Sequence, residues 1–122
     1  MSEPGGTSPE SAIPDEVAMA AHVLGSPINY AILRYLGGLD DPAKGAHWGD
    51  IADALPKFAA TSIRRHLDKL EETAVVTVDT PKGDRHGKSI RYSVDRERLE
   101  LLFAQTFAFV IRDADIEPDV EL

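Results

Sequence analysis

The spacing of apolar residues changes once along this chain, from the period of a helix to that of a strand. Residues 60–72 carry apolar side chains at positions i, i+4 and i+7, which predicts a helix. Directly after it, residues 75–80 are rich in β-branched side chains and residues 89–94 alternate between polar and apolar. The intervening segment 81–88 is polar and contains two glycines, so it is predicted to be the tip of a hairpin. The apolar positions of the helix are Ile63, Leu67 and Leu70.

Three further helices are predicted before this helix–hairpin unit and one after it. Ser26 before Pro27 is typical of an N-cap followed by the first helical residue, and Pro56 ends a short helix. Asp95 is the expected N-cap of the last helix. Residues 46–48 fit either a short strand or an extended lead-in to the short helix. The predicted helices cover about residues 15–24, 27–36, 49–55 and 96–112.

A short helix, a tight turn, a longer helix and then a hairpin is the order of a winged helix-turn-helix. We therefore predict an α+β fold that is mainly α, with about five helices and a two- or three-stranded β-wing. The length of 122 residues suits one domain. We expect this domain to span residues 13–112, between disordered acidic tails over residues 1–12 and 113–122.

The charge of the chain is unevenly distributed. The net charge of −8 argues at first against a nucleic-acid partner. However, residues 1–25 contain four acidic residues and 113–122 contain five, and neither segment contains a lysine or arginine. Segments 57–70 and 81–91 each contain four basic residues and one acidic residue, so each carries a charge of +3. Two basic segments, one on a helix and one on a hairpin tip, indicate a polyanionic partner.

The predicted helix over residues 60–72 presents a polar, basic face opposite its apolar stripe. An α-helix fits the major groove of DNA, where arginine can bind guanine and lysine or hydroxyl groups can contact phosphates. A charged face opposite an apolar stripe is also what any solvated helix shows, and polar hairpin tips are common. The candidate DNA-binding residues are Thr61, Ser62, Arg64, Arg65, Lys69, Lys82, Arg85, His86 and Lys88.

The last predicted helix carries more apolar surface than one face can bury. A domain of this size cannot easily cover both faces, which favours a second copy of the chain as a partner. A twofold dimer would match a palindromic operator. In the alternative, Phe107 and Phe109 pack under the first helix of the same chain. The candidate dimer-interface residues are Val17, Ala21, Leu24, Leu99, Leu102, Phe103 and Val110.

The sequence gives no sign of catalysis, a metal or a cofactor. The absence of cysteine excludes disulfides, thiolate metal sites and a cysteine nucleophile. The four histidines (His22, His47, His66 and His86) lack the spacing of metal ligands, and His66, beside the apolar stripe, is expected to be a partly buried structural residue. We find no paired nucleophile and base and no glycine-rich phosphate loop.

Residues 97–112 form the most apolar segment, but four charged residues interrupt it, so we expect no membrane helix. The first residues have neither the basic nor the apolar region of a secretion signal. A cytoplasmic protein is therefore expected.

Four segments of the chain also resemble segments of one protein family, and they occur in the same order as in that family. TSIRRHLDKLEETAVV (61–76) resembles the recognition helix and first wing strand of ArsR-type repressors, and WGDIADAL (48–55) resembles the preceding helix. SPINYAILRYL (26–36) and RHGKSIRYSV (85–94) are similar to an earlier helix and to the wing. The likeness covers about residues 14–110 and implies a homodimeric transcriptional regulator. Its matching positions are Thr61, Ser62, Arg64, Arg65 and His66 on the helix and Arg85 and Gly87 in the wing.

The chain departs from that family at two points. Metal-sensing members carry Cys or His ligands near the recognition helix or on the last helix, whereas this chain lacks cysteine and has no histidine in residues 95–122. The resemblance also leaves the acidic C-terminal tail unexplained.

Two functions from different classes fit the sequence. The first is a sequence-specific DNA-binding regulator that acts as a repressor, binding double-stranded operator DNA as a homodimer, with helix 60–72 in the major groove and the wing, 81–88, on the backbone. The alternative is a winged-helix protein-interaction module that does not bind DNA, which the net charge of −8 favours. The two basic segments distinguish them, because a protein-binding module has no need to keep both.

Overall fold

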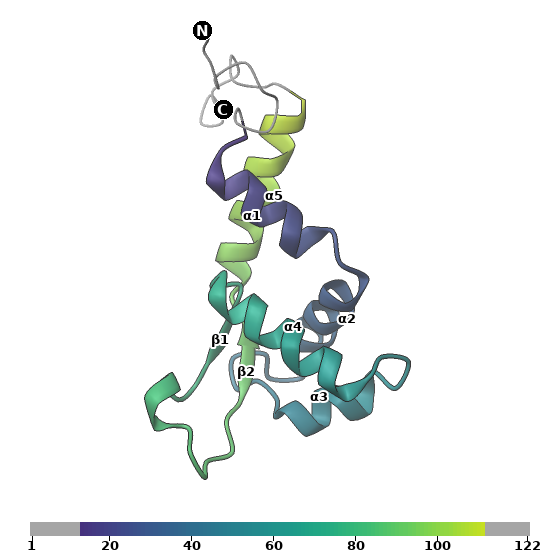
Figure 1. The fold of residues 1–122 in the computed structure, drawn as a ribbon, viewed down its shortest axis with the longest axis vertical. Helices are drawn as coiled ribbons and strands as arrows, with labels where there is room; N and C mark the ends of the chain where they lie inside the picture. Colours follow the sequence, from purple (N-terminus) through teal and green to yellow (C-terminus); the bar gives the residue numbers. More distant parts are fainter. Residues whose placement is uncertain (1–12, 112–122) are drawn as a thin grey trace, which may run out of the picture.

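The structure, a computed structural model, describes residues 13–111. Within this range the chain forms five α-helices, one 3-10 turn and two short strands (Figure 1). The two expected acidic tails, 1–12 and 113–122, lie outside the described residues, as does residue 112 at the expected end of the last helix. The elements are α1 (Asp15–Leu24), α2 (Pro27–Gly37), α3 (Trp48–Ala54), α4 (Ala60–Glu72), β1 (Val76–Val78), η3 (Lys82–Asp84), β2 (Tyr92–Val94) and α5 (Arg96–Val110).

Two of the predicted helix starts are held by the side chains that the sequence indicates. The Ser26 hydroxyl accepts a hydrogen bond from the backbone N–H of Asn29 at 3.2 Å, and Pro27 is the first residue of α2. The Asp95 carboxylate accepts one from the N–H of Arg98 at 3.0 Å, at the start of α5. Both caps satisfy an N–H that has no partner within the helix, so these predictions are confirmed.

The two strands of the hairpin are shorter than the predicted ranges of 75–80 and 89–94. β1 pairs antiparallel with β2, with Val76 opposite Val94 and Val78 opposite Tyr92. Residues 46–48 form no strand, but Ala46 makes one bridge to Tyr92, with N–O distances of 2.9 and 2.8 Å. The strands end early because the Asp79 side chain takes over hydrogen bonding from the ladder, accepting from the N–H of Arg91 at 3.0 Å.

One core joins the helices to the hairpin. The predicted stripe of α4 (Ile63, Leu67 and Leu70) is fully buried, with side chains of α2, α3 and β2 packed in the same cluster. Figure 1 shows α1 lying across α5 at one end of the molecule, and α2, α3 and α4 gathered at the other. The hairpin projects beside α4 with its tip away from α5 (Figure 1). The longest basic loop is thus placed next to the helix with the basic face.

Across residues 13–111, every helix is too short or too polar to cross a lipid bilayer.

Candidate nucleic-acid interface

Helix α4 presents to solvent the face that its sequence predicts. Opposite its buried stripe, the side chains of Thr61, Arg64, Arg65 and Lys69 are exposed, while Ser62 is half-buried at the flank. Asp68 and, in the last turn, Glu72 are the exposed acidic residues of that face. The exposed side of α4 therefore offers two guanidinium groups, an ammonium and a hydroxyl together with two carboxylates.

A groove of about 280 Å³ separates α4 from the hairpin. Arg64 lines it from α4 and Lys88 from the hairpin tip, and Trp48, at the start of α3, also lines it. The guanidinium carbon of Arg64 lies 5.6 Å from the centroid of the Trp48 ring. A cation over an aromatic face at this distance is attracted by it, so Trp48 helps to hold Arg64 at the groove. The structure thus brings cations of the helix and of the hairpin to one groove.

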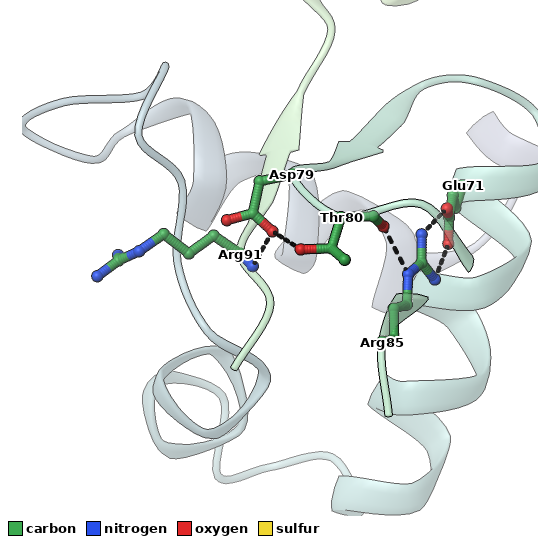
Figure 2. A network of polar contacts seen from close by, with 5 residues as sticks. All are labelled: Glu71, Asp79, Thr80, Arg85 and Arg91. Carbon is green, nitrogen blue, oxygen red and sulfur yellow. Dashed lines mark hydrogen bonds and ion pairs between the residues drawn. The ribbon is translucent and has the colours of Figure 1, made fainter. Parts of the chain in front are cut away.

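Arg85, expected to contact phosphate, is instead engaged inside the protein (Figure 2). Its guanidinium forms a bidentate ion pair with the Glu71 carboxylate, one N–O distance being 3.1 Å, and Nε donates to the Thr80 carbonyl at 2.8 Å. The two charged side chains are only 20% and 16% exposed. The hydrogen bond to Glu71 raises the pKa of Arg85 further above its ordinary value. Arg85 therefore joins the hairpin tip to the last turn of α4, which differs from the exposed cation expected at this position.

A second set of contacts joins the two ends of the hairpin loop (Figure 2). The Thr80 hydroxyl donates to the Asp79 carboxylate at 3.2 Å, and the same oxygen accepts the N–H of Arg91. The hydrogen bond from Arg91 lowers the pKa of Asp79. The remaining expected tip residues, Lys82, His86 and Lys88, are exposed. The tip is thus fixed at its base while its cations face solvent.

Lys69 lies apart from that groove. It faces a second cavity that is lined by α1, α2 and α4. The candidate residues of α4 therefore divide between two sides of the helix, with Arg64 facing the hairpin and Lys69 facing α1 and α2.

Sequence reasoning missed two residues that hold α4 in place. Asn29 is 4% exposed, and its amide donates to the Val23 carbonyl at 3.1 Å while its oxygen pairs with Nδ1 of His66 at 3.0 Å. Arg98 forms an ion pair with Glu16 at 3.2 Å and donates to the Thr73 carbonyl at 3.1 Å. The expectation that His66 is a partly buried structural residue is confirmed. The sequence signal that could have identified Asn29 is that it is a polar residue next to the apolar stripe of α2.

The exposed apolar surface of α5 differs from the predicted stripe. The prediction that Leu102 lies in the dimer interface is wrong. Leu102 is 0% exposed and belongs to the core of its own chain, because α1 covers that side of α5. Leu24 and Leu99 are partly buried against the same core, and Val17 is half-buried. Ala21 and the i, i+4, i+7 stripe Phe103, Phe107 and Val110 are exposed.

Phe107 and Phe109 do not pack under α1. They are 63% and 41% exposed, so the alternative in which the first helix covers them is wrong. Leu101 and Ile111 add to the exposed apolar area of α5.

Two solved structures resemble this one. A crystal structure of a possible transcriptional regulator for arsenical resistance superposes with a TM-score of 0.54 and 21% sequence identity, covering 84% of this chain and 98% of the other. A solution NMR structure from Mycobacterium bovis gives a TM-score of 0.55 and 18% identity, covering 98% and 99%. That protein is described as a homodimeric winged helix-turn-helix DNA-binding domain and a possible ArsR-family transcriptional regulator. No protein-family profile and no curated protein matches the sequence.

This chain has the winged helix-turn-helix fold. In it, α3 and α4 are the helix-turn-helix, α4 occupies the position of the recognition helix, and the β1–β2 hairpin is the wing. The predicted fold class is confirmed. Among residues 13–111, no three histidine or carboxylate side chains are grouped so that they could hold a metal ion.

The Glu71–Arg85 pair should contribute measurably to the stability of the winged helix. We expect Glu71→Gln to lower the free energy of unfolding by about 1 kcal/mol, because it leaves a largely buried guanidinium without its counter-charge. Chemical denaturation measures this. The matched control is Glu100→Gln, whose partner Arg96 lies 3.9 Å away with both side chains more than two-thirds exposed, and which should change little. Equal effects of the two substitutions would contradict the role given to Arg85.

His66 should make the stability of the fold sensitive to mild acid. Burial, and then the nearby Arg65 charge, lower the pKa of His66 below its usual 6.5. The unfolded chain then binds the proton more readily, so stability falls as the pH drops below about 6.5 and stops falling below the folded-state pKa. We expect the melting temperature of the wild type to drop more than that of His66→Gln between about pH 7 and pH 5. If the melting temperatures of the two proteins fall equally with decreasing pH, this prediction is wrong.

Proposed function

We propose that this protein is a sequence-specific DNA-binding transcriptional regulator that binds its operator as a homodimer and acts as a repressor. Recognition helix α4 would enter the major groove, and the wing would lie on the adjacent backbone. One observation carries the proposal: Arg64 of α4 and Lys88 of the wing border the same groove, so a helix cation and a wing cation can meet one polyanion. The likeness to a DNA-binding winged helix-turn-helix domain supports it.

The roles of the exposed residues follow from their chemistry. Arg65 points away from the core and is the candidate for guanine in the major groove, since arginine binds the O6 and N7 of guanine in a bidentate manner. Arg64, Lys69, Thr61 and Ser62 are suited to phosphates or nearby base edges. In the wing, Lys82, His86 and Lys88 are proposed to contact phosphates.

The dimer is proposed from the exposed apolar stripe of α5. An isolated protein of this size seldom leaves so many large apolar side chains in water. A twofold pairing through α5, with Ala21 of α1 at its edge, would cover them and match a palindromic operator. The repressor role rests on the resemblance to ArsR-type repressors alone.

Salt dependence of DNA binding tests this function against the protein-interaction alternative. With about six phosphate contacts per dimer, log K should fall with log salt at a slope of about −5. Affinity for promoter DNA, measured by fluorescence anisotropy, should therefore fall about a thousandfold between about 50 and 200 mM salt. The absence of DNA binding at low salt would instead favour the protein-interaction module, which the net charge of −8 supports.

A further inference from the structure

A cavity of about 440 Å³ lies behind the recognition helix, between α1, the start of α2 and the second half of α4. Its volume is within the range of small-molecule sites, about 300–1,000 Å³. Met19, Val23 and Leu70 give it an apolar wall. Its lining also holds one lysine, Lys69, and one carboxylate, that of Glu72. Two histidines, His22 and His66, also line the cavity.

The walls of this cavity are held by polar contacts rather than by packing alone. The Asn29 amide donates to the carbonyls of His22 and Val23 at 3.4 and 3.1 Å, and so fixes the end of α1. Its oxygen accepts from Nδ1 of His66 on α4. On another side, the Arg98 guanidinium contacts the sulfur of Met19 at 3.2 Å. A site whose walls are fixed in advance loses little entropy when a ligand binds.

We propose that this cavity binds a small apolar carboxylate. Its hydrocarbon part would contact Met19, Val23 and Leu70, and its carboxylate would pair with the exposed ammonium of Lys69. The Lys69 ammonium is the group in this lining that favours an anion. Apolar walls with a few polar groups that fix orientation are the usual composition of a small-molecule site.

Binding in the cavity would weaken DNA binding, an inference that rests on the proposed function. Lys69 is also proposed to contact a DNA phosphate, so the ligand and DNA compete for the same ammonium. The ligand also brings a negative charge to the recognition helix, which repels the DNA backbone. A small carboxylate would therefore act as an inducer that releases the operator.

NMR titration of the DNA-free protein with 1-naphthoate tests the site. We expect saturable shifts of backbone amides that line the cavity. Lys69→Gln should weaken 1-naphthoate binding about fivefold and leave binding of the neutral analogue 1-naphthalenemethanol unchanged. The control variant Lys44→Gln removes an exposed lysine from the loop before α3 and should alter neither. Shifts confined to the exposed face of α5, no saturation at millimolar probe, or equal losses for both probes would overturn the proposal.

A DNA titration with and without saturating 1-naphthoate tests the regulatory step. We expect about a fivefold weakening of DNA binding in the wild type and none with 1-naphthalenemethanol. Unchanged DNA affinity in a protein that binds 1-naphthoate would overturn the inducer role. If the protein binds no DNA at all, the proposed function fails and the inducer role fails with it, while the NMR titration still decides whether the cavity is a site.

Discussion

Phe107→Glu should convert the proposed dimer to a monomer and weaken the proposed operator binding by about a hundredfold or more. Phe107 is 63% exposed at the centre of the apolar stripe of α5. In a twofold dimer this one substitution places two carboxylates in a desolvated interface. The free-energy cost of burying them far exceeds the gain from burying the aromatic rings. A monomer also binds one half-site, so it loses the gain of about 10²–10⁴ that linked binding gives. Sedimentation velocity and DNA titration measure the two effects.

A matched variant separates the interface from a general effect of charge. Tyr30→Glu removes an exposed aromatic side chain from α2, outside the α5 stripe, and introduces the same charge. It should remain dimeric. If Phe107→Glu sediments as a dimer, α5 is not the interface and the dimer proposed above is wrong. If Tyr30→Glu alone dissociates, the interface includes α2 instead.

Arg65→Ala should cost about 1–3 kcal/mol of binding free energy on the cognate operator, a loss of about five- to 150-fold. The side chain lies on the exposed face of α4, so the melting temperature should stay almost unchanged. The loss should be much smaller on unrelated DNA, because a base contact is specific and a phosphate contact is not. Anisotropy titrations on the two DNAs, with a thermal melt, measure this.

The control for Arg65→Ala is Arg96→Ala, which removes an exposed arginine from the first turn of α5. It should affect both DNAs little. A large drop in the melting temperature of Arg65→Ala would mean that the guanidinium contributes to the fold. An equal loss of affinity for cognate and unrelated DNA would mean that Arg65 contacts a phosphate and not a base.

Local signals predicted most of the fold. The caps at Ser26 and Asp95 and the apolar stripe of α4 each depend on residues within one or two turns of helix, and each was confirmed. The exposed face of α4 follows from the same stripe, since the two faces of a helix are complementary.

Contacts between distant segments could not be predicted in this way. Arg85 looks like any basic hairpin residue until the fold places Glu71, fourteen residues earlier, beside it. Leu102 was misplaced for a similar reason, because the periodicity of α5 does not reveal which side α1 covers. Likewise, Arg98 bonds to Thr73 and pairs with Glu16, and only the tertiary structure brings these three together.

If the protein binds DNA as proposed, the ion pair between Glu71 and Arg85 has a consequence for which operators it selects. Since it fastens the wing to the last turn of α4, the protein sets the distance between the exposed side chains of α4 and the wing cations. In the proposed complex, DNA must adopt the groove width that suits this distance. Sequences that carry the right bases but resist that width would pay a deformation energy, so the flexibility of base steps that the protein never touches would affect which operators it selects.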